Sequence, residues 1–418
     1  MALQVAGERL VVWRNAAADI WSVQKDVCPH RLAPLSQGRV DPLTQCLECP
    51  YHGQQFSADG TCTRIPQLED GGKIPRSNDA TTLRTHSTGD LLWAFVPLPA
   101  GQASHFDTLP EHVLPELLNC TSFTSRELPY SVDFLIENFL DPSHIPFAHH
   151  SLQATRADGA PIPMQQLTSI DNATHVELGY QDVIRGRARD GVVSFIAPCY
   201  YHFRVKSPVN NGNWSIGLIV LAAPVAPGKC RIFLDLPALS RVPKWFPKWI
   251  LHAFINRFLD SDIWVHDQER TQRGHGGNAF AEDKGFGGVG SKYVMPTASD
   301  SGTRLWRQWW RRHMADSPVF GEPRSRLAWL SRAEQLDRYE AHTKHCTSCL
   351  GALANARRAK ALAPFAALLL LALAPSTLLR VLAVAIGLAV DHLAGRVVRA
   401  MLGPQRRDVY SAAQFPAK

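Results

Sequence analysis

The chain is organised around one stretch, Glu137-Asn-Phe-Leu-Asp-Pro-Ser-His-Ile-Pro-Phe-Ala-His-His150. Within it Asn138, Asp141, His144 and His149 have the spacing N-x2-D-x2-H-x4-H, which on helical turns directs all four side chains to the same side. Two imidazoles that converge in this way suit several transition metals. A histidine-rich surface loop is the alternative. The carboxylate three residues before His144 favours the metal site, because such groups orient metal-bound imidazoles.

A second metal-binding pattern lies near the N-terminus, where two short loops each carry one cysteine and one histidine. Cys28 and His30 form a C-x-H pair, and Cys49 and His52 form a C-x2-H pair after 18 intervening residues. Two thiolates and two imidazoles are the ligands of a Rieske [2Fe–2S] cluster. A Cys2His2 zinc site is the alternative, but zinc fingers place both histidines together on one helix. We therefore expect a [2Fe–2S] cluster here.

Composition and charge narrow the class of protein. The chain has 418 residues, enough for two or three domains, and carries a formal net charge of +7. Lysine and arginine are spread along the chain and no nucleic-acid motif accompanies them, so we expect no nucleic-acid partner. The chain has nine cysteines, and the placement of several of them beside histidines favours metal or redox chemistry over a disulfide framework. The first residues enter a strand pattern at once, as though an upstream portion were missing, and no transit peptide is visible.

Longer motifs around these residues resemble one known family. Cys28-Pro-His-Arg-Leu-Ala-Pro-Leu-Ser-Gln-Gly-Arg39, Tyr51-His-Gly53 and Cys62-Thr-Arg-Ile-Pro-Gln67 are similar to the Rieske domain of the chloroplast oxygenases related to pheophorbide a oxygenase. The Phe-Ala-His-His150 ending and Ala197-Pro-Cys-Tyr200 resemble the same family. Gln54 stands where the family usually has tryptophan, which leaves the local packing over the cluster open.

The resemblance implies a role for each motif residue. His144 and His149 would bind a mononuclear ferrous ion, and Asp141 would connect that iron to the Rieske histidine of a neighbouring subunit. The third ligand should be a carboxylate that completes a facial triad. In the helix expected over 248–272, Asp262 lies on the apolar face and matches the second aspartate of the family's Asp-x-Asp segment. Asp262 is the predicted ligand, with Asp260 and Asp267 as the alternatives.

Several other segments receive predictions. Alternating runs around 9–27 predict a hairpin, and strand-like runs from 192 to 236 predict a curved antiparallel sheet with flanking helices. The Gly-rich segment 273–290 is typical of a mobile loop and could act as an active-site lid. The helix with Trp306, Trp309 and Trp310 fits either a membrane interface or a core-facing stripe.

Cys346 and Cys349 form a C-x2-C pair that follows Lys344 and His345. Positive neighbours lower the pKa of a thiol, so a reversible disulfide is plausible, and the pair resembles the C-terminal C-x2-C of this oxygenase branch. Two reduced thiols, or a metal with ligands from elsewhere, remain the alternatives.

The C-terminal segment is strongly apolar. Residues 361–379 carry no charge and can just cross a bilayer, and 381–390 continue apolar after Arg380. A helical hairpin, spanning or partly re-entrant, fits these lengths, and its basic flanks would lie on one side of the membrane. A buried pair of soluble helices is the alternative.

The expected fold is therefore α+β. We predict an all-β Rieske domain over 1–115, a mononuclear-iron domain with an antiparallel helix-grip (START-like) sheet over 116–335, a redox C-x2-C segment over 336–355 and a membrane-anchoring hairpin and tail over 356–418. The resemblance also implies a homotrimer that brings the two iron centres together head to tail.

The resemblance implies oxidative opening of the pheophorbide a macrocycle with O2 and ferredoxin electrons, at a chloroplast membrane, either thylakoid or inner envelope. A related tetrapyrrole hydroxylase or protochlorophyllide-type oxygenase is an alternative. A second alternative is a redox-sensing Rieske subunit of the inner-envelope protein translocon, which would have no need for His144, His149 and an aimed carboxylate.

Overall fold

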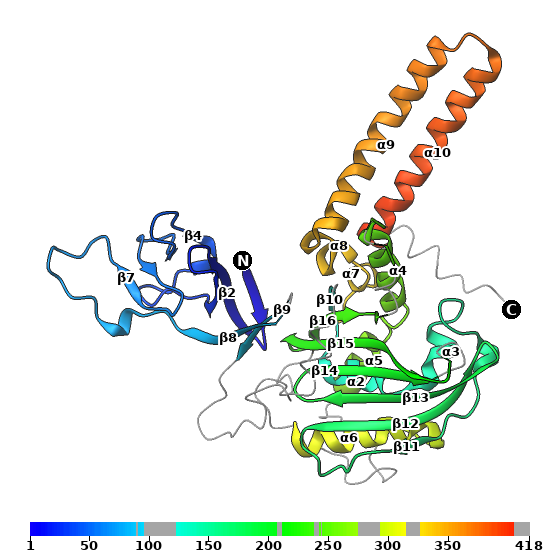
Figure 1. The fold of residues 1–418 in the computed structure, drawn as a ribbon, viewed down its shortest axis with the longest axis horizontal. Helices are drawn as coiled ribbons and strands as arrows, with labels where there is room; N and C mark the ends of the chain where they lie inside the picture. Colours follow the sequence, from blue (N-terminus) through cyan, green and yellow to red (C-terminus); the bar gives the residue numbers. More distant parts are fainter. Residues whose placement is uncertain are drawn as a thin grey trace.

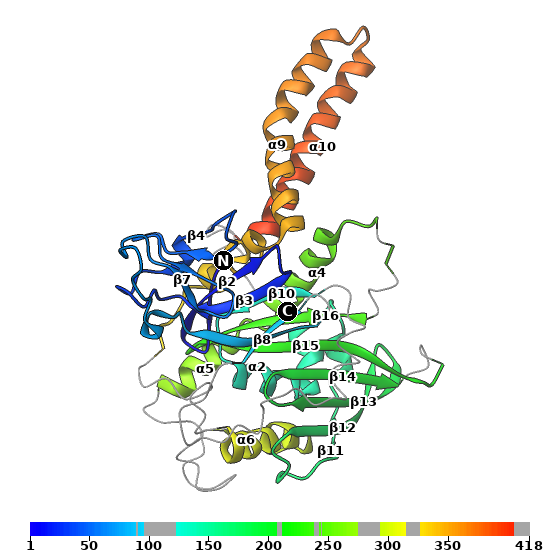
Figure 2. The ribbon, with the colours of Figure 1, turned by 60° about the vertical axis from the view of Figure 1, so that its left-hand side comes forward.

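The structure is a computed structural model, and it describes residues 1–88, 91–95, 123–206, 211–237, 242–243, 245–274, 293–314 and 327–404. Figures 1 and 2 show a small β domain, a larger sheet covered by helices, and a long helical hairpin that projects from the larger domain. The domain boundary predicted near residue 115 and most of the Gly-rich segment 273–290 lie outside the described residues.

The small domain consists of two antiparallel sheets. One has the order β1-β2-β3-β8-β9 and the other β4-β5-β6-β7. Their bounds are β1 Ala2–Val5, β2 Glu8–Asn15, β3 Ile20–Lys25, β8 Thr82–Thr88, β9 Leu91–Phe95, β4 Arg39–Val40, β5 Leu47–Glu48, β6 Gln55–Phe56 and β7 Cys62–Arg64, with short helices η1 Leu35–Gln37 and η2 Arg76–Asn78. The predicted hairpin is confirmed, because β2 pairs with β3 across the turn after Asn15.

A seven-stranded antiparallel sheet forms the base of the larger domain, in the order β10-β16-β15-β14-β13-β12-β11. Its strands are β10 Thr124–Leu128, β11 Met164–Gln166, β12 His175–Ile184, β13 Arg187–Ile196, β14 Tyr200–Lys206, β15 Trp214–Ala226 and β16 Lys229–Asp235. Every second residue of β12 is buried, which places one face of the sheet on the core. The predicted antiparallel sheet is therefore confirmed.

Helices cover the core face of this sheet (Figure 1). The helices of this domain are α2 Val132–Phe139, α3 Ile145–Ala148, α4 Lys248–Asp260, α5 Val265–Gly274 and α6 Ser301–His313, with short helices η3 Pro142–His144, η4 Arg156–Asp158 and η7 Ala298–Asp300. In α6, Trp306, Trp309 and Trp310 are buried in the main apolar cluster. The membrane-interface interpretation of this helix is wrong, because its tryptophans lie on the face that packs against the core.

The segment 248–272 is not one helix, as the sequence predicted, but two. Helix α4 ends at Asp260 and α5 begins at Val265. Ile255 and Leu259 are buried on α4 as expected, while Asp262 lies in the break between the helices. The direction of the Asp262 side chain is therefore set by the turn between the helices and not by a continuous helix.

The hairpin consists of α9 Thr347–Leu373 and α10 Thr377–Leu402, and it follows the short helices α7 Arg332–Gln335, α8 Arg338–Ala341 and η8 Thr343–His345. The predicted helical hairpin is confirmed, although the C-x2-C segment continues directly into α9. Helix α10 has a mean hydropathy of 1.8 over its most apolar window, of which 11% is buried, so it is long and apolar enough to cross a membrane. Large apolar side chains of both helices, such as Phe365, Leu369 and Leu388, are exposed.

Candidate metal centres

The motif at Glu137–His150 folds as a chain of short helices. Helix α2 ends at Phe139, and the Asp141 carboxylate caps η3 by accepting a hydrogen bond from the Ser143 N–H at 2.8 Å. Pro142 starts η3 and Pro146 follows at the start of α3, where a missing N–H costs no helical hydrogen bond. The tight turns bring the two histidines to the same side, as the spacing predicted.

His144, His149 and Asp262 converge on one point. The His149 Nε2 atom lies 3.3 Å from the His144 Nε2 atom and 3.3 Å from Asp262 Oδ2, and the His144 Nε2–Asp262 Oδ2 distance is 4.0 Å. The three donor atoms lie close enough together to hold one metal ion. Two imidazoles and one carboxylate that leave other positions open are the ligand set of non-haem ferrous sites.

The two alternative aspartates lie elsewhere. Asp260 forms ion pairs with Arg126 and Arg338, which are themselves buried or nearly so. Asp267 contacts His266 and Gln335. Neither carboxylate belongs to the group of donors at the histidine pair.

Hydrogen bonds fix which nitrogen each histidine presents. His149 Nδ1 lies 2.8 Å from Ser261 Oγ, whose hydroxyl donates to the Phe258 carbonyl, so Nδ1 is the protonated nitrogen. His144 Nδ1 donates to the Asp141 carbonyl. Both Nε2 atoms are then free to act as ligands, as in metal sites whose imidazoles are oriented by outer hydrogen bonds. The Phe258 ring stacks on His149 at a centroid distance of 3.8 Å.

Burial sets the charge state of this site. Burial, and next the nearby His144, lower the pKa of His149 to about 3, so its imidazole is neutral at pH 7 and able to bind metal. Burial raises the pKa of Asp262 to about 6, although His144 and the Asn138 amide, 3.1 Å away, oppose the rise. Asp262 Oδ1 is buried and has no hydrogen-bond partner within the described part of the chain. A buried carboxylate oxygen without a partner is costly, and a bound cation would remove that cost.

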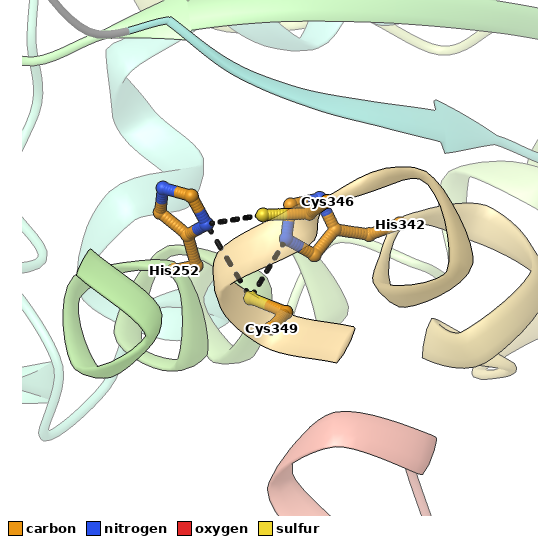
Figure 3. A group of neighbouring side chains, drawn as sticks. All are labelled: His252, His342, Cys346 and Cys349. Carbon is orange, nitrogen blue, oxygen red and sulfur yellow. Dashed lines mark hydrogen bonds between the residues drawn. The ribbon is translucent and has the colours of Figure 1, made fainter. Parts of the chain in front are cut away.

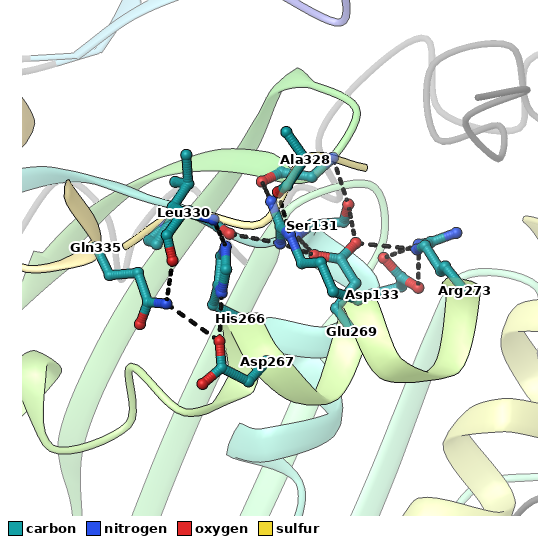
Figure 4. A network of polar contacts seen from close by, with 12 residues as sticks. Ser131, Asp133, His266, Asp267, Glu269, Arg273, Ala328, Leu330 and Gln335 are labelled. Atoms are coloured by element: carbon teal, nitrogen blue, oxygen red, sulfur yellow. Dashed lines mark hydrogen bonds and ion pairs between the residues drawn. The ribbon is translucent and has the colours of Figure 1, made fainter. Parts of the chain in front are cut away.

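A buried polar network connects α2 and α5 (Figure 4). The Glu269 carboxylate accepts hydrogen bonds from the Ser131 hydroxyl at 2.6 Å and from Arg273 Nε at 3.0 Å. Arg273 also pairs with Asp133 on α2 at 3.1 Å. Because α2 carries Asn138 and the turn before α5 carries Asp262, the network fixes these two groups relative to each other. Sequence reasoning missed it, since its partners lie about 140 residues apart in the chain.

The four predicted cluster ligands lie on two neighbouring loops of the small domain. The Cys28 and Cys49 side chains are buried and hydrogen-bond to each other, and burial raises the pKa of Cys28 to about 11. The His30 and His52 rings lie 4.7 Å apart at their centroids, with His30 exposed. This pairing, sulfurs inside and imidazoles at the surface, fits a two-iron cluster whose irons carry two cysteines and two histidines respectively.

Gln54, the position whose packing the sequence left open, follows Tyr51-His-Gly53. Its side chain is buried, and Gln54 Oε1 accepts a hydrogen bond from Asn78 Nδ2 at 3.1 Å. Cys28 Sγ lies 3.9 Å from the same oxygen. The Gln54 side chain therefore places polar atoms next to a predicted cluster ligand.

Cys346 and Cys349 are free thiols at the start of α9, and two histidines that the sequence did not indicate lie beside them (Figure 3). His252 comes from α4 and His342 follows α8. Lys344, expected to activate the thiols, pairs instead with Glu340 one turn earlier. His342 lies only four residues before Cys346, so its proximity had a local signal, whereas the approach of His252 depends on the tertiary fold.

Two protein families match this chain, one in its N-terminal part and one in its central part. Residues 1–84 match the Rieske [2Fe-2S] domain family, and residues 195–278 match the pheophorbide a oxygenase family. Pheophorbide a oxygenase of Oryza sativa subsp. japonica is 33% identical over 384 residues, which cover 84% of this chain and 69% of that protein.

Two further relatives show the range of the similarity. Protochlorophyllide-dependent translocon component 52 of Arabidopsis thaliana is 28% identical over 404 residues, covering 83% of this chain and 69% of that protein. Dicamba monooxygenase bound to dicamba is similar in structure with a TM-score of 0.56 at 15% identity, over 74% of this chain and 91% of that one. The structural likeness supports the fold of a Rieske oxygenase.

Proposed function

Because the chain belongs to the pheophorbide a oxygenase family of Rieske oxygenases, we propose that it opens the macrocycle of pheophorbide a with O2 and ferredoxin electrons. One observation carries the proposal: His144, His149 and Asp262 converge in a chain that is 33% identical to a pheophorbide a oxygenase. The chain is an oxygenase with a [2Fe–2S] cluster, and its family uses a mononuclear iron. The substrate and the electron donor are the parts that we propose.

The ligand assignment is part of the proposal. Cys28, His30, Cys49 and His52 would hold the [2Fe–2S] cluster, and His144, His149 and Asp262 would hold the mononuclear iron. When bound, the cluster supplies single electrons and the mononuclear iron supplies the O2-activating redox chemistry. The unpartnered Asp262 oxygen supports iron binding here, since a cation would satisfy it.

Several protein groups would prepare the iron site for reaction. Ser261 and the Asp141 carbonyl hold the two imidazoles with Nε2 directed inward. The Asn138 amide donates to Asp262 Oδ2 and so limits the carboxylate to one orientation. Phe258 covers one face of His149 and keeps water from it. Such fixed ligands require little reorganisation when substrate binds.

We further propose a homotrimer. In Figure 1 the β4 and β7 loops of the small domain lie at the opposite end of the molecule from α3, next to which the two iron-site histidines lie. An electron would have to cross the width of one chain, whereas a head-to-tail ring would place the cluster of one subunit beside the iron of the next. Asp141, half-buried at the edge of the iron site, would connect the two centres.

The two sequence relatives named above, from Oryza sativa subsp. japonica and Arabidopsis thaliana, are chloroplastic proteins. We propose that this chain acts at a chloroplast membrane and that α9 and α10 anchor it there. The exposed apolar surface of the hairpin supports this anchor, because contact of so much apolar surface with water is unfavourable and a bilayer would remove it.

The substrate proposal is tested with purified, iron-loaded protein, reduced ferredoxin, O2 and pheophorbide a. We expect a ring-opened product detected by mass spectrometry, with incorporation of label from 18O2. A cluster that is reduced normally by ferredoxin, with no ring-opened product, would contradict the proposal. Protochlorophyllide and a linear tetrapyrrole in parallel reactions test the alternative oxygenases.

A redox-sensing translocon subunit is the second candidate, favoured by the similarity to translocon component 52. A sensor needs the cluster, Cys346 and Cys349 but no mononuclear iron, so it would contain about two irons per chain. The oxygenase would contain about three. Iron analysis of the purified protein separates the two functions.

A further inference from the structure

Four side chains at the base of the hairpin converge outside both iron centres. Cys346 Sγ and Cys349 Sγ lie 3.3 and 3.4 Å from His252 Nδ1, and Cys349 Sγ lies 3.3 Å from His342 Nε2 (Figure 3). All four donor atoms lie within 4.8 Å of one another. From these contacts we propose a structural Zn²⁺ site that joins the hairpin to the catalytic domain, a role independent of the proposed oxygenase function.

The distances match one tetrahedral ion. Zinc–sulfur bonds of about 2.3 Å and zinc–nitrogen bonds of about 2.0 Å at tetrahedral angles place sulfur and nitrogen roughly 3.5 Å apart. The three printed sulfur–nitrogen distances, 3.3 to 3.4 Å, are close to that value. Cys2His2 is a ligand set of closed structural zinc sites.

A neighbouring hydrogen bond prepares His342 for a metal. Its Nδ1 atom lies 2.6 Å from the carbonyl oxygen of Ser125 on β10, so Nδ1 carries the proton and Nε2 is free to bind. His342 is 2% exposed and Cys349 is fully buried, so the site excludes water on that side. A backbone carbonyl that orients a ligating imidazole is typical of metal sites.

The charge of the two cysteine ligands also favours a zinc ion at this site. The ligand form of cysteine is the thiolate, so zinc binding would deprotonate both Cys346 and Cys349. Two thiolates beside each other need a cation to balance their charge, and the zinc ion would supply it.

The site would connect parts that lie far apart in the chain. His252 lies on α4, whose end leads into the turn that carries Asp262, and both cysteines begin the membrane hairpin. Cys349, Leu353 and Met401 form a small apolar cluster there with Trp249 of α4. A zinc ion among these residues would hold the hairpin in a fixed orientation to the catalytic domain.

The proposal is tested on the full chain, purified in detergent with metal-free buffers. We expect about one zinc per chain beyond the iron, and X-ray absorption at the zinc edge showing two sulfur and two nitrogen ligands. This spectrum needs no variant, so a folding defect cannot obscure the result. Absence of zinc, or a Cys346–Cys349 disulfide in the protein as purified, would overturn the proposal.

Variants identify the ligands. His342→Ala should lose the zinc, while His342→Cys should keep it because a thiolate can replace the imidazole. The matched control, Cys199→Ala, removes a cysteine of a separate apolar cluster and should keep the zinc. Zinc that persists in a Cys346→Ser/Cys349→Ser variant would place the ion elsewhere. The intensity of the reduced-cluster resonance should stay unchanged in all of these variants, which separates a failure here from a failure of the oxygenase assignment.

Discussion

At the scale of single residues, Ser261 fixes the orientation of His149, a proposed iron ligand. The Ser261 hydroxyl accepts a hydrogen bond from His149 Nδ1 at 2.8 Å and donates one to the Phe258 carbonyl, so the imidazole ring is fixed on the side opposite its Nε2 atom. Ser261→Ala should lower the affinity for iron about 10- to 100-fold, as loss of such outer contacts does in other metal sites. Titration of the apo-protein with ferrous ion measures the change. An affinity equal to that of the Ser301→Ala control, at the half-buried start of α6, would contradict the role.

The charge state of Asp262 makes iron binding depend on pH. Burial raises its pKa to about 6, while His149, with its pKa at about 3, stays neutral over the range of interest. Iron binds the ionised carboxylate, so Asp262 must lose a proton on iron binding below about pH 6. The Asp262 carboxyl alone should therefore make the affinity fall at least tenfold for each pH unit below about 6. Ferrous titrations from pH 5 to 8 check this, and a flat profile would be the opposite result.

Local spacing was enough to predict part of this site. His144 and His149 share one short segment, and Asp262 was found because a carboxylate on an apolar face requires an explanation. Ser261 and Phe258 were missed as partners of His149, since their roles depend on a turn that brings together residues more than 100 positions apart. The network around Glu269 was missed for the same reason.

At the scale of elements, the contact between α2 and α5 supports the site. Arg273 is 9% exposed and pairs with Glu269 and Asp133, which are 0% and 4% exposed. Arg273→Met would leave the buried Asp133 carboxylate without its cation, whereas Glu269 would keep its second cation, Arg270. Breaking a buried pair in this way costs about 3–5 kcal/mol. Urea unfolding measured by circular dichroism gives the loss of stability.

An exposed ion pair provides the control for that measurement. Arg312 and Asp171 are 57% and 64% exposed, and removing such a pair changes stability by about 1 kcal/mol or less. Equal effects of Arg273→Met and Arg312→Met would mean that the α2–α5 network does not stabilise the domain.

The break between α4 and α5 shows where pattern reasoning failed for elements. Apolar residues at helical spacing predicted one helix over 248–272, but these residues lie in α4, and α5 is a separate helix of mostly polar residues. At the break between the two helices the Asp262 carboxylate contacts Asn138 and the His149 imidazole. Tertiary contacts therefore override local periodicity at the residue with the chemical role.

At the scale of the whole molecule, the hairpin projects away from the catalytic sheet (Figure 2). Leu369 on α9 and Leu382 on α10 are 61% and 46% exposed. Leu369→Glu with Leu382→Glu should release the protein from liposomes, because a charge within the bilayer costs about 2.5–3.5 kcal/mol. Flotation measures binding. The control, Leu43→Glu, changes an exposed residue of the Rieske domain and should still float; flotation of the double variant would contradict the anchor.

The central claim is that electrons from ferredoxin pass from the Rieske cluster to an iron held by His144, His149 and Asp262. Reduced protein is mixed with O2 and pheophorbide a, and the resonance of the reduced cluster is followed by freeze-quench electron paramagnetic resonance. In the unchanged protein the resonance should disappear as ring-opened product forms. In Asp262→Ala it should persist without product, while Asp267→Asn, which alters an aspartate outside the site, should behave like the unchanged protein. Equal reoxidation of the cluster in Asp262→Ala and the unchanged protein would contradict the account.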